Sequence, residues 1–494
     1  MIVIPAELLS EGGAPSPKLL SAILQKWQPE AERLSALKRL YDRDHAISRR
    51  ARMAGLPNNR LVHDLPGYIV TIASGFLTGK PVTYTPPEGA EGAFQPLQEA
   101  LQAASSASVD SELSVDAAVY GKGVELCYAD ENAEPRMAAV DPRSCFVVYD
   151  DTVEHRPLLG LMLREMLDEN LNRAGEHVTV YTAQKIFYYQ RKSTETPHLV
   201  AEERHFFGQL PLTEYWNNSR EMGDFEPVTS LIDAYDLLQS DRLNDKQQFT
   251  DAIMILKGVG GLSPDDTAEE VQTEDGAQEA TTADKEQTLP SERLRRTRML
   301  FLPEDASAEY ITKPDSESGN EVLRNGLKED IHKFSFVPDL SDKNFAGTAS
   351  GVSMRYKLFG LEQLVGQKEQ WFREGLRQRL SCLNHFLKLK GAPDCDTGAV
   401  QIAFTRSLPV NDLEVSQTLM NYSDMVPRKL LLSQVPFVED PDKALQMLDA
   451  EEEERRRQQQ ELFTPGAFLE DGAQAAEDRQ PKAESNHIRG QSAT

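Results

Sequence analysis

The longest helical pattern in this chain extends over residues 350–390. Its apolar residues mostly recur at steps of three and four between charged residues, a spacing that places them on one face of an α-helix. Gly391 and Pro393 follow and indicate where the helix stops. A helix of this length spans about 60 Å. One ordinary domain cannot enclose it, so we expect a spine that packs against neighbouring elements.

A polar, glycine-containing segment over residues 339–349 precedes this helix. It follows the end of an earlier helical pattern, because Pro338 lacks the N–H group that a helix interior needs. Gly347 frees the backbone near the other end of the segment, and the hydroxyl of Ser350 is placed to cap the first turn of the long helix. We therefore expect a loop that is held out at one end of the spine.

At 494 residues and 39% hydrophobic content, the chain can bury cores in two or more domains. Its net charge is −26, from 53 basic and 79 acidic residues. This balance argues against tight, sequence-specific binding of nucleic acid, which needs basic surfaces. An acidic wall does suit a conduit, because like charge keeps DNA from adhering while it slides. On charge alone, however, an ordinary acidic protein of the cytosol is the favoured interpretation.

The sequence carries no signal for a metal site, a cofactor or a disulfide framework. Its four cysteines are scattered without a C-x-x-C pair, and its histidines show no metal-binding spacing. We expect reduced thiols and no cofactor. The first residues lack a cationic segment followed by an apolar one, and no uncharged run is long enough to span a bilayer. Export and membrane insertion are therefore not expected.

The N-terminal part combines runs of helix with runs of short strand, which predicts an α+β region rather than a doubly wound sheet. Helical patterns cover residues 16–55, 61–78 and 97–118, and Pro66 marks a helix start within the second. Strand patterns separated by turn signals cover residues 82–84, 124–128, 137–140, 145–149, 158–166, 178–181 and 186–189.

Two further helical patterns, over residues 227–257 and 321–336, flank an irregular module. Within this module, residues 263–292 carry ten acidic residues against the single Lys285 and almost no bulky apolar residue. Such a segment is expected to be mobile and solvated. Strand patterns follow at residues 299–302 and 310–312. Beyond the long helix, a strand is predicted at residues 400–404, then helices through Glu453.

Four stretches of the sequence, in the expected order, resemble the portal proteins of siphophage-type tailed bacteriophages, which are also called head-tail connectors. They are residues 58–81, 230–258, 336–357 and 408–440. The resemblance implies a mostly helical α+β portal-type fold with a wing, a stem, a clip and a crown. It also implies a homo-oligomeric ring, usually of about twelve subunits, around a central DNA channel.

The same resemblance implies a set of partners. Double-stranded DNA would pass through the ring during genome packaging and ejection, in transient and non-specific contact. The terminase large subunit would dock at the clip and later be replaced by a head-completion or adaptor protein, and the ring would assemble together with the major capsid and scaffold proteins. The protein would then lie in the virion at the capsid portal vertex, after assembly in the host cytoplasm.

On this resemblance the chain divides into the parts of a portal subunit. The acidic insertion 263–292 departs from the family pattern and would lengthen the clip. The expected parts are a wing over residues 1–226, a stem helix over 227–257, a clip over 258–316, a second stem helix over 317–338, a tunnel loop over 339–349, a long wing helix and return strand over 350–407, crown helices over 408–464 and a disordered tail over 465–494.

The tunnel loop supplies the candidate DNA-contacting residues. In this reading Lys343, Asn344 and Thr348 touch phosphates transiently, and Phe345 packs one loop against the next. The contacts are expected to be weak, because the surrounding wall is acidic and repels DNA.

The second stem helix adds two candidates that face the channel, Lys328 and Lys333. In an acidic tube they would provide local, weak attraction for phosphates. The alternative for these lysines is ordinary pairing along the helix surface with Glu321 or Glu329.

No catalytic constellation emerges from the sequence, so an enzyme is not expected. Acidic pairs such as Asp241 and Asp245 are explained by composition. A hydrolase elbow needs G-x-S-x-G, whereas residues 347–351 place Ser350 one position late. Two other functions stay open. One is a cytosolic helical adaptor without a DNA channel; the other is a packaging nuclease, which needs clustered metal-binding carboxylates on a β-rich core.

Overall fold

The structure is a computed structural model that describes residues 1–462 except 11, 54–55, 193–194, 250–252, 258–306, 312–316, 342–350, 407–411, 424, 433–434, 436–437 and 439–440. The chain divides into two compact units, Met1–Leu408 and Pro409–Thr494, and each is described on its own. Helices and mostly antiparallel sheets are mixed within the first unit, which confirms the predicted α+β fold class.

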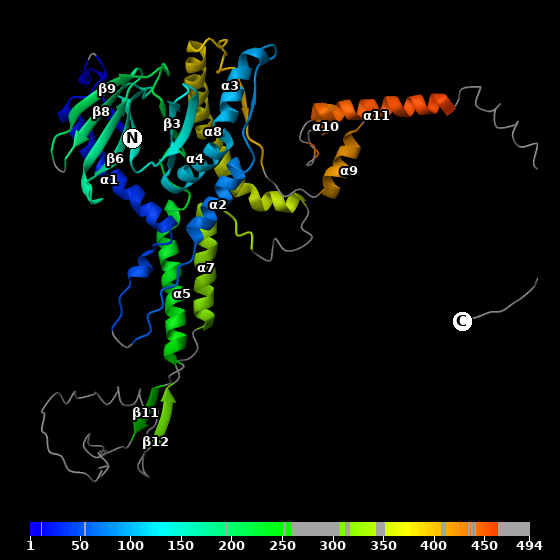
Figure 1. Cartoon of the computed structure of the whole chain (residues 1–494). Coiled ribbons are helices and arrows are strands. Elements are labelled where there is room, and N and C mark those ends of the chain that lie inside the picture. The colour runs from blue at the N-terminus through cyan, green and yellow to red at the C-terminus, as the bar shows by residue number, and fades with distance from the viewer. Residues whose placement is uncertain are drawn as a thin grey trace, which may run out of the picture. The chain divides into compact units, whose positions relative to one another are not determined.

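A six-stranded sheet forms part of the core of the first unit (Figure 1). Successive side chains of a strand point to opposite faces of the sheet, and both faces are buried: Val178 and Val180 belong to one hydrophobic cluster, and Val147 and Tyr181 belong to another. Helix α1 (Pro17–Tyr41) packs on the sheet through Trp27, whose ring stacks on Phe146 with centroids 4.1 Å apart. In spatial order the strands are β1 (Ile2–Ile4), β5 (Cys145–Asp150), β6 (Pro157–Leu167), β7 (Arg173–Tyr181), β8 (Lys185–Arg191) and β9 (His198–Arg204).

A smaller sheet and a group of helices complete this core. Helix α8 (Gly351–Leu389) packs on the central part of the unit, against β10, α2 and α3. The three-stranded sheet has the order β10 (Leu212–Trp216), β3 (Lys122–Ala129) and β4 (Pro135–Val140), and β2 (Thr83–Thr85) pairs with β13 (Gln401–Ala403). The other helices are α2 (Leu65–Thr78), α3 (Glu91–Ala103), α4 (Ser106–Tyr120) and the short η1 (Ala6–Leu8) and η2 (Ala46–Arg49).

Helix α8 confirms the predicted spine and begins and ends within one residue of the expected bounds. Its apolar stripe is buried, as at Leu376, Leu380 and Leu383. Two charged side chains, Lys368 and Arg379, are buried on the same helix. A buried charge needs partners, and these two therefore tie the spine to its neighbours through ion pairs.

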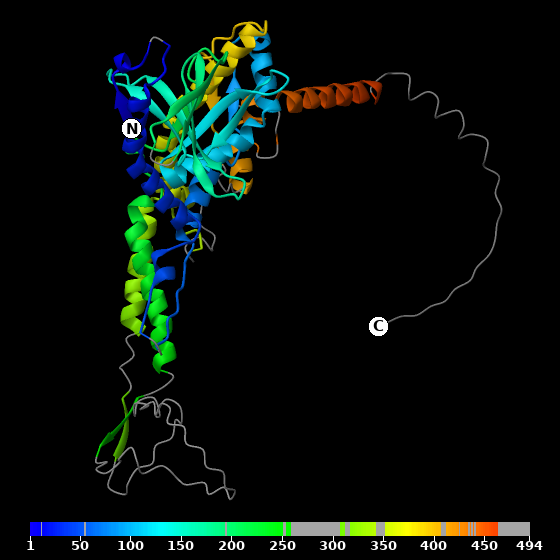
Figure 2. The same cartoon turned by 60° about the vertical axis from the view of Figure 1, so that its left-hand side comes forward.

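A helical hairpin projects from this core, with α5 (Thr229–Phe249) and α7 (Glu317–Ser335) side by side in both views (Figures 1 and 2). The short η3 (Glu226–Val228) leads into α5. Between the two helices in the chain, β11 (Ile253–Lys257) pairs antiparallel with β12 (Ser307–Ile311), so that Ile253 lies opposite Ile311.

Several predicted bounds are wrong. The expected helix 227–257 ends at Phe249, because residues 253–257 are an apolar run that gains a strand partner distant in sequence. The helix expected at 97–118 is two helices, separated where Ser105 adopts a positive φ of 52°. Strands β1, β9 and β10 were not predicted. Residues 263–292, 299–302 and 465–494 lie outside the described residues.

The second unit consists of α9 (Asp412–Tyr422), α10 (Arg428–Leu432) and α11 (Pro441–Leu462). Arg428 Nη1 lies 2.7 Å from Glu452 Oε1 and ties α10 to α11. The expected helices are present, and α11 continues beyond Glu453 to Leu462. Within the part of the chain that the structure describes, no helix combines the length and apolar character needed to cross a membrane.

Candidate functional site

The described chain contains the attachment of the predicted tunnel loop but only its first residues. The loop is described from Asp339 to Ser341, whereas residues 342–350 lie outside the description. The four loop candidates, Lys343, Asn344, Phe345 and Thr348, therefore stay predictions. The described residues show how α7 ends and how the first loop residues are held.

Helix α7 ends before Pro338, where one residue adopts the left-handed backbone conformation. Phe336 has a φ of 60°, in the left-handed region that ends helices. His332 Nδ1 lies 2.9 Å from the carbonyl oxygen of Val337, whose side chain is fully buried. The helix therefore ends at Ser335 and the chain turns sharply, while Pro338 prevents any return to helix.

Tyr68 on α2 clamps the backbone just beyond this turn. Its hydroxyl donates to the carbonyl oxygen of Pro338 at 2.9 Å and accepts from the amide of Leu340 at 2.8 Å. Its ring meets His332 edge to face, with centroids 5.7 Å apart. Burial raises the pKa of the Tyr68 hydroxyl, so it stays a neutral donor and acceptor. The start of the loop is thus fixed to a helix of the core.

Asp339 supplies a second anchor. Its carboxylate pairs with Lys328 and accepts from the amide and the hydroxyl of Ser341 at 3.0 and 2.6 Å. Burial opposes ionisation, but the hydrogen bonds from Lys328 and Ser341 outweigh it and lower the pKa of Asp339 to about 2. The carboxylate is therefore charged at neutral pH, and the loop begins at a fixed ion pair.

The two stem lysines have different surroundings. Lys328 contacts Asp339 rather than Glu321 or Glu329, the partners expected from ordinary helix pairing. Lys333 is exposed, with its ammonium 5.4 Å from the centroid of Phe334. Residues five apart lie about 140° around an α-helix, so the two lysines occupy different faces of α7. Their role as channel-facing residues stays a prediction.

The hairpin has its own ionic and apolar contacts. Arg242 on α5 lies 3.2 Å from Glu321 on α7, and Arg324 pairs with the same carboxylate. Nearer the core, Ile232 and Ile331 belong to the same hydrophobic cluster and are fully buried. These contacts fix the register of the two antiparallel helices.

A segment after α1 is fastened along α5 by a ladder of hydrogen bonds. The buried carboxylate of Asp236 forms hydrogen bonds with Nδ1 of His45 at 2.5 Å and with Nδ1 of His63 at 2.8 Å. One turn further on, Asp241 pairs with Arg50 at 2.8 Å and with Arg52. Burial of Asp236 opposes its ionisation, but the hydrogen bonds from His45 and His63 lower its pKa. Sequence reasoning missed this ladder and attributed Asp241 to composition.

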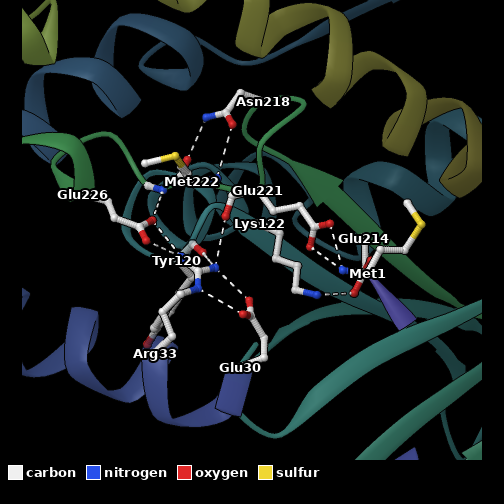
Figure 3. Close-up of polar contacts among 11 residues, drawn as sticks. Met1, Glu30, Arg33, Tyr120, Lys122, Glu214, Asn218, Glu221, Met222 and Glu226 are labelled. Carbon is white, nitrogen blue, oxygen red and sulfur yellow. Dashed lines mark hydrogen bonds and ion pairs between the residues drawn. The ribbon is translucent and has the colours of Figure 1, made fainter. Parts of the chain in front are cut away.

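The root of the hairpin is fixed by a second network, drawn in Figure 3. Arg33 on α1 donates to Glu30 at 2.7 Å and to Glu226, in η3, at 2.6 Å. It also donates to the carbonyl oxygens of Tyr120 and Glu221, at 3.3 and 3.1 Å. One guanidinium thus joins α1, the end of α4 and the start of the stem. The residues of this network lie in α1, at residue 120 and in residues 221–226, so no local sequence pattern could have indicated it.

Buried ion pairs connect the elements of the neighbouring core, among them three made by α8. Arg379 on α8 donates to Asp110 at 2.6 Å and to Glu125 at 2.8 Å, and all three side chains are at least 97% buried. Lys368 on α8 pairs with Asp224, which lies in the segment just before the stem. The spine is therefore connected by charge to the residues that lead into α5.

The described residues show no arrangement for metal chemistry. They contain no group of three or more His, Cys, Asp or Glu side chains placed to hold a metal ion. The four cysteines are buried and free. The geometry shows a packed core with a helical hairpin and a loop that is anchored at its start.

Comparison with known proteins shows the family to which this chain belongs. The family model for phage portal proteins, SPP1 Gp6-like, matches residues 20–460. The chain therefore belongs to the phage portal protein family. It is similar to the portal protein of Bacillus phage SPP1, with 22% identity over 418 residues, 80% of this chain and 76% of that protein.

Two further similarities were found. The portal protein of Clostridium phage phiCD119 is 24% identical over 264 residues, which cover 53% of this chain and 52% of that protein. Among solved structures, one described as the neck of an empty GTA particle computed with C6 symmetry has a TM-score of 0.42 and 12% identity. That alignment covers 78% of this chain and 89% of the other.

Proposed function

We propose that copies of this chain close into a ring of about twelve subunits at one vertex of a phage capsid, and that double-stranded DNA passes through the ring during packaging and ejection. The observation that carries this proposal is the family match over residues 20–460. The helical hairpin and the long spine helix support the proposal, because they would serve as the stem and the wing helix of such a subunit.

The tunnel loop would narrow the channel, one copy from each subunit. The clamp by Tyr68 and the ion pair between Lys328 and Asp339 support this idea, since they set the direction in which the loop leaves the core. Lys343, Asn344 and Thr348 would then touch phosphates, while Phe345 packs loop against loop. Such contacts would guide the DNA without holding it, because an acidic wall repels the duplex elsewhere.

We further propose the partners of each part. The clip, residues 258–316, would receive the terminase large subunit during packaging and a head-completion or adaptor protein afterwards. The major capsid and scaffold proteins would contact the outer parts of the ring during assembly in the host cytoplasm. In the mature virion the protein would then lie at the portal vertex.

Electron microscopy of the purified protein tests the proposal directly. A turbine-shaped ring with a central hole, and a native mass of about a dozen chains, is the expected result. A filament or a simple dimer over a range of salt and protein concentrations would instead identify the protein as a helical adaptor without a channel, and would overturn the proposal.

A further inference from the structure

The last turn of α1 and the segment that follows it have a charge opposite to that of the whole chain. Residues 38–61 contain seven basic and two acidic residues, so their net charge is +5, whereas the chain carries −26. Asp241 on α5 neutralises part of this charge through Arg50 and Arg52. Arg39, Arg43, Arg49 and Arg60 are exposed. The segment therefore presents a basic surface on an otherwise acidic molecule.

This basic segment lies on the side of α5 that faces away from α7. Its hydrogen bonds reach Asp236, Ser240 and Asn244, which recur at steps of four on one face of α5. Arg242, which contacts α7 through Glu321, lies roughly opposite to this face, about 160° from Asn244 around the helix. Figures 1 and 2 show the segment running alongside α5. The hairpin thus has two separate edges.

The basic edge consists of Arg43, Met53 and Leu61. Met53 is 80% exposed and Leu61 is 36% exposed. The height of Leu61 along the hairpin is fixed, because its amide donates to the hydroxyl of Ser240 at 3.0 Å. Arg43 lies two residues before His45 and is therefore near Asp236, closer to the core.

The acidic edge consists of Val322, Leu323, Glu329 and Asp330 on α7. Val322 is 74% exposed and Leu323 53% exposed, and both carboxylates are exposed. The contact between Arg242 and Glu321 places Val322 near the height of Ser240, and hence of Leu61. Because α7 runs antiparallel to α5, Glu329 and Asp330 lie further toward the core, near the height of Arg43. The apolar Leu61 of one edge thus lies at about the height of the apolar Val322 of the other edge. Nearer the core, the basic Arg43 lies at about the height of the acidic Glu329 and Asp330.

We propose that the basic edge of one copy docks on the acidic edge of the next copy, with Arg43 against Glu329 and Asp330 and with Leu61 against Val322. The proposal rests on the ring of the proposed function. Copies in a ring are related by rotation about its axis, so stems along that axis would meet at equal heights through a head-to-tail contact. Copies that each carry −26 repel one another, and a local contact of opposite charge offsets this repulsion where they touch.

Charge reversal tests the ionic part of this contact. We expect Arg43→Glu to raise the concentration needed for ring assembly by about tenfold or more, and Glu329→Arg to do the same. Combining the two in one chain restores opposite charge across the contact and should recover assembly. Arg204→Glu, on the exposed strand β9, makes the same change of charge away from both edges and should leave assembly unchanged.

A cross-link tests the position of the contact without depending on charge. In a Leu61→Cys and Val322→Cys double variant the two thiols of one chain lie on opposite edges of the hairpin. Oxidation by dioxygen with a copper phenanthroline catalyst should therefore join neighbouring chains and give a ladder of linked oligomers up to the closed ring. Reduction should return single chains, and the two single variants should give no ladder beyond dimers.

The possible failures are distinguishable. If the unmodified protein forms no ring, the proposed function itself fails. If rings form but neither the charge reversals nor the cross-link has an effect, the interface lies elsewhere and only this inference is overturned. If the Arg43→Glu variant assembles normally into rings but binds DNA more weakly, the basic segment faces nucleic acid. That result would also overturn this inference.

Discussion

At the scale of single residues, the core of this protein depends on charged side chains removed from water. Arg379 is fully buried and holds the carboxylates of Asp110 and Glu125. Removing one partner of such a group is costly, because the other charges stay buried without compensation. These residues are therefore expected to be structural, and to be much more sensitive than the exposed charges on the same helix.

Replacement of Arg379 by alanine should lower the free energy of unfolding by about 3–5 kcal/mol. Chemical denaturation of the first unit measures this change. Arg377→Ala is the matched control, since Arg377 lies on the same helix and pairs with Glu374 at 3.5 Å while about half exposed. That control should change stability by less than about 0.5 kcal/mol. Equal effects of the two substitutions would contradict the assigned role.

The Tyr68 clamp can be tested by Tyr68→Phe. The variant loses the hydrogen bonds to Pro338 and Leu340, so local opening of the loop attachment should become easier by about 1–2 kcal/mol. Faster hydrogen exchange of the Leu340 amide, with an unchanged ring, is the expected observation. Tyr188→Phe removes a hydroxyl that bonds Glu203 on the sheet and serves as the control. Unchanged exchange at Leu340 would argue against the clamp.

The Asp339 anchor should depend on pH. Its pKa of about 2 in the folded state lies below the ordinary value of 3.8, so ionisation of the carboxylate favours the folded attachment. This contribution is present above pH about 4 and is lost as the pH falls from about 4 to about 2. Protection of the Ser341 amide, corrected for intrinsic exchange, should fall over the same range. In Asp339→Asn the protection should be lower and independent of pH there.

At the scale of elements, periodicity predicted those helices whose apolar residues face one continuous core. Helix α8 was expected within one residue at each end, and α2 was expected to begin near Pro66. Two of the failures, at strands β1 and β11, have a different cause. Strand β1 is three residues long and pairs with β5, far away in sequence, and β11 gains its partner β12 in the same way. Such pairing decides the structure of a short apolar run, and no local pattern encodes it.

The tunnel loop is the element whose side chains are expected to matter for transport rather than for folding. A solvated loop buries little apolar area, so replacing Lys343, Asn344 and Phe345 together by alanine should leave stability and ring size nearly unchanged. The same variant should reduce DNA packaging or retention in a virion assay. Normal packaging by the variant, or a failure to form rings, would contradict the assignment of the loop as the constriction.

At the scale of the whole molecule, the order of the long helices was predictable from sequence and the contacts that hold them were not. Helices α5, α7 and α8 follow one another as expected, whereas their assignment to a stem, a tunnel loop and a wing stays a prediction. The networks of Arg33, Asp236 and Asp339 combine residues from distant segments, and a single sequence does not show which charges meet. Lys328 illustrates this limit, because its partner Asp339 lies beyond the end of its own helix rather than one turn away.

The acidic insertion 263–292 provides the last prediction. With ten acidic residues and a single lysine it offers no apolar pattern from which a core could form. The contacts described above that hold the stem, such as Arg242 to Glu321 and Arg33 to Glu226, involve none of its residues. Replacing residues 263–292 by a short glycine-serine linker should therefore leave the free energy of unfolding and ring assembly unchanged, as measured by denaturation and native mass spectrometry. Since the segment lies in the proposed clip, packaging by the motor should be the property that changes. Loss of rings would instead show that the insertion is an ordered contact between subunits.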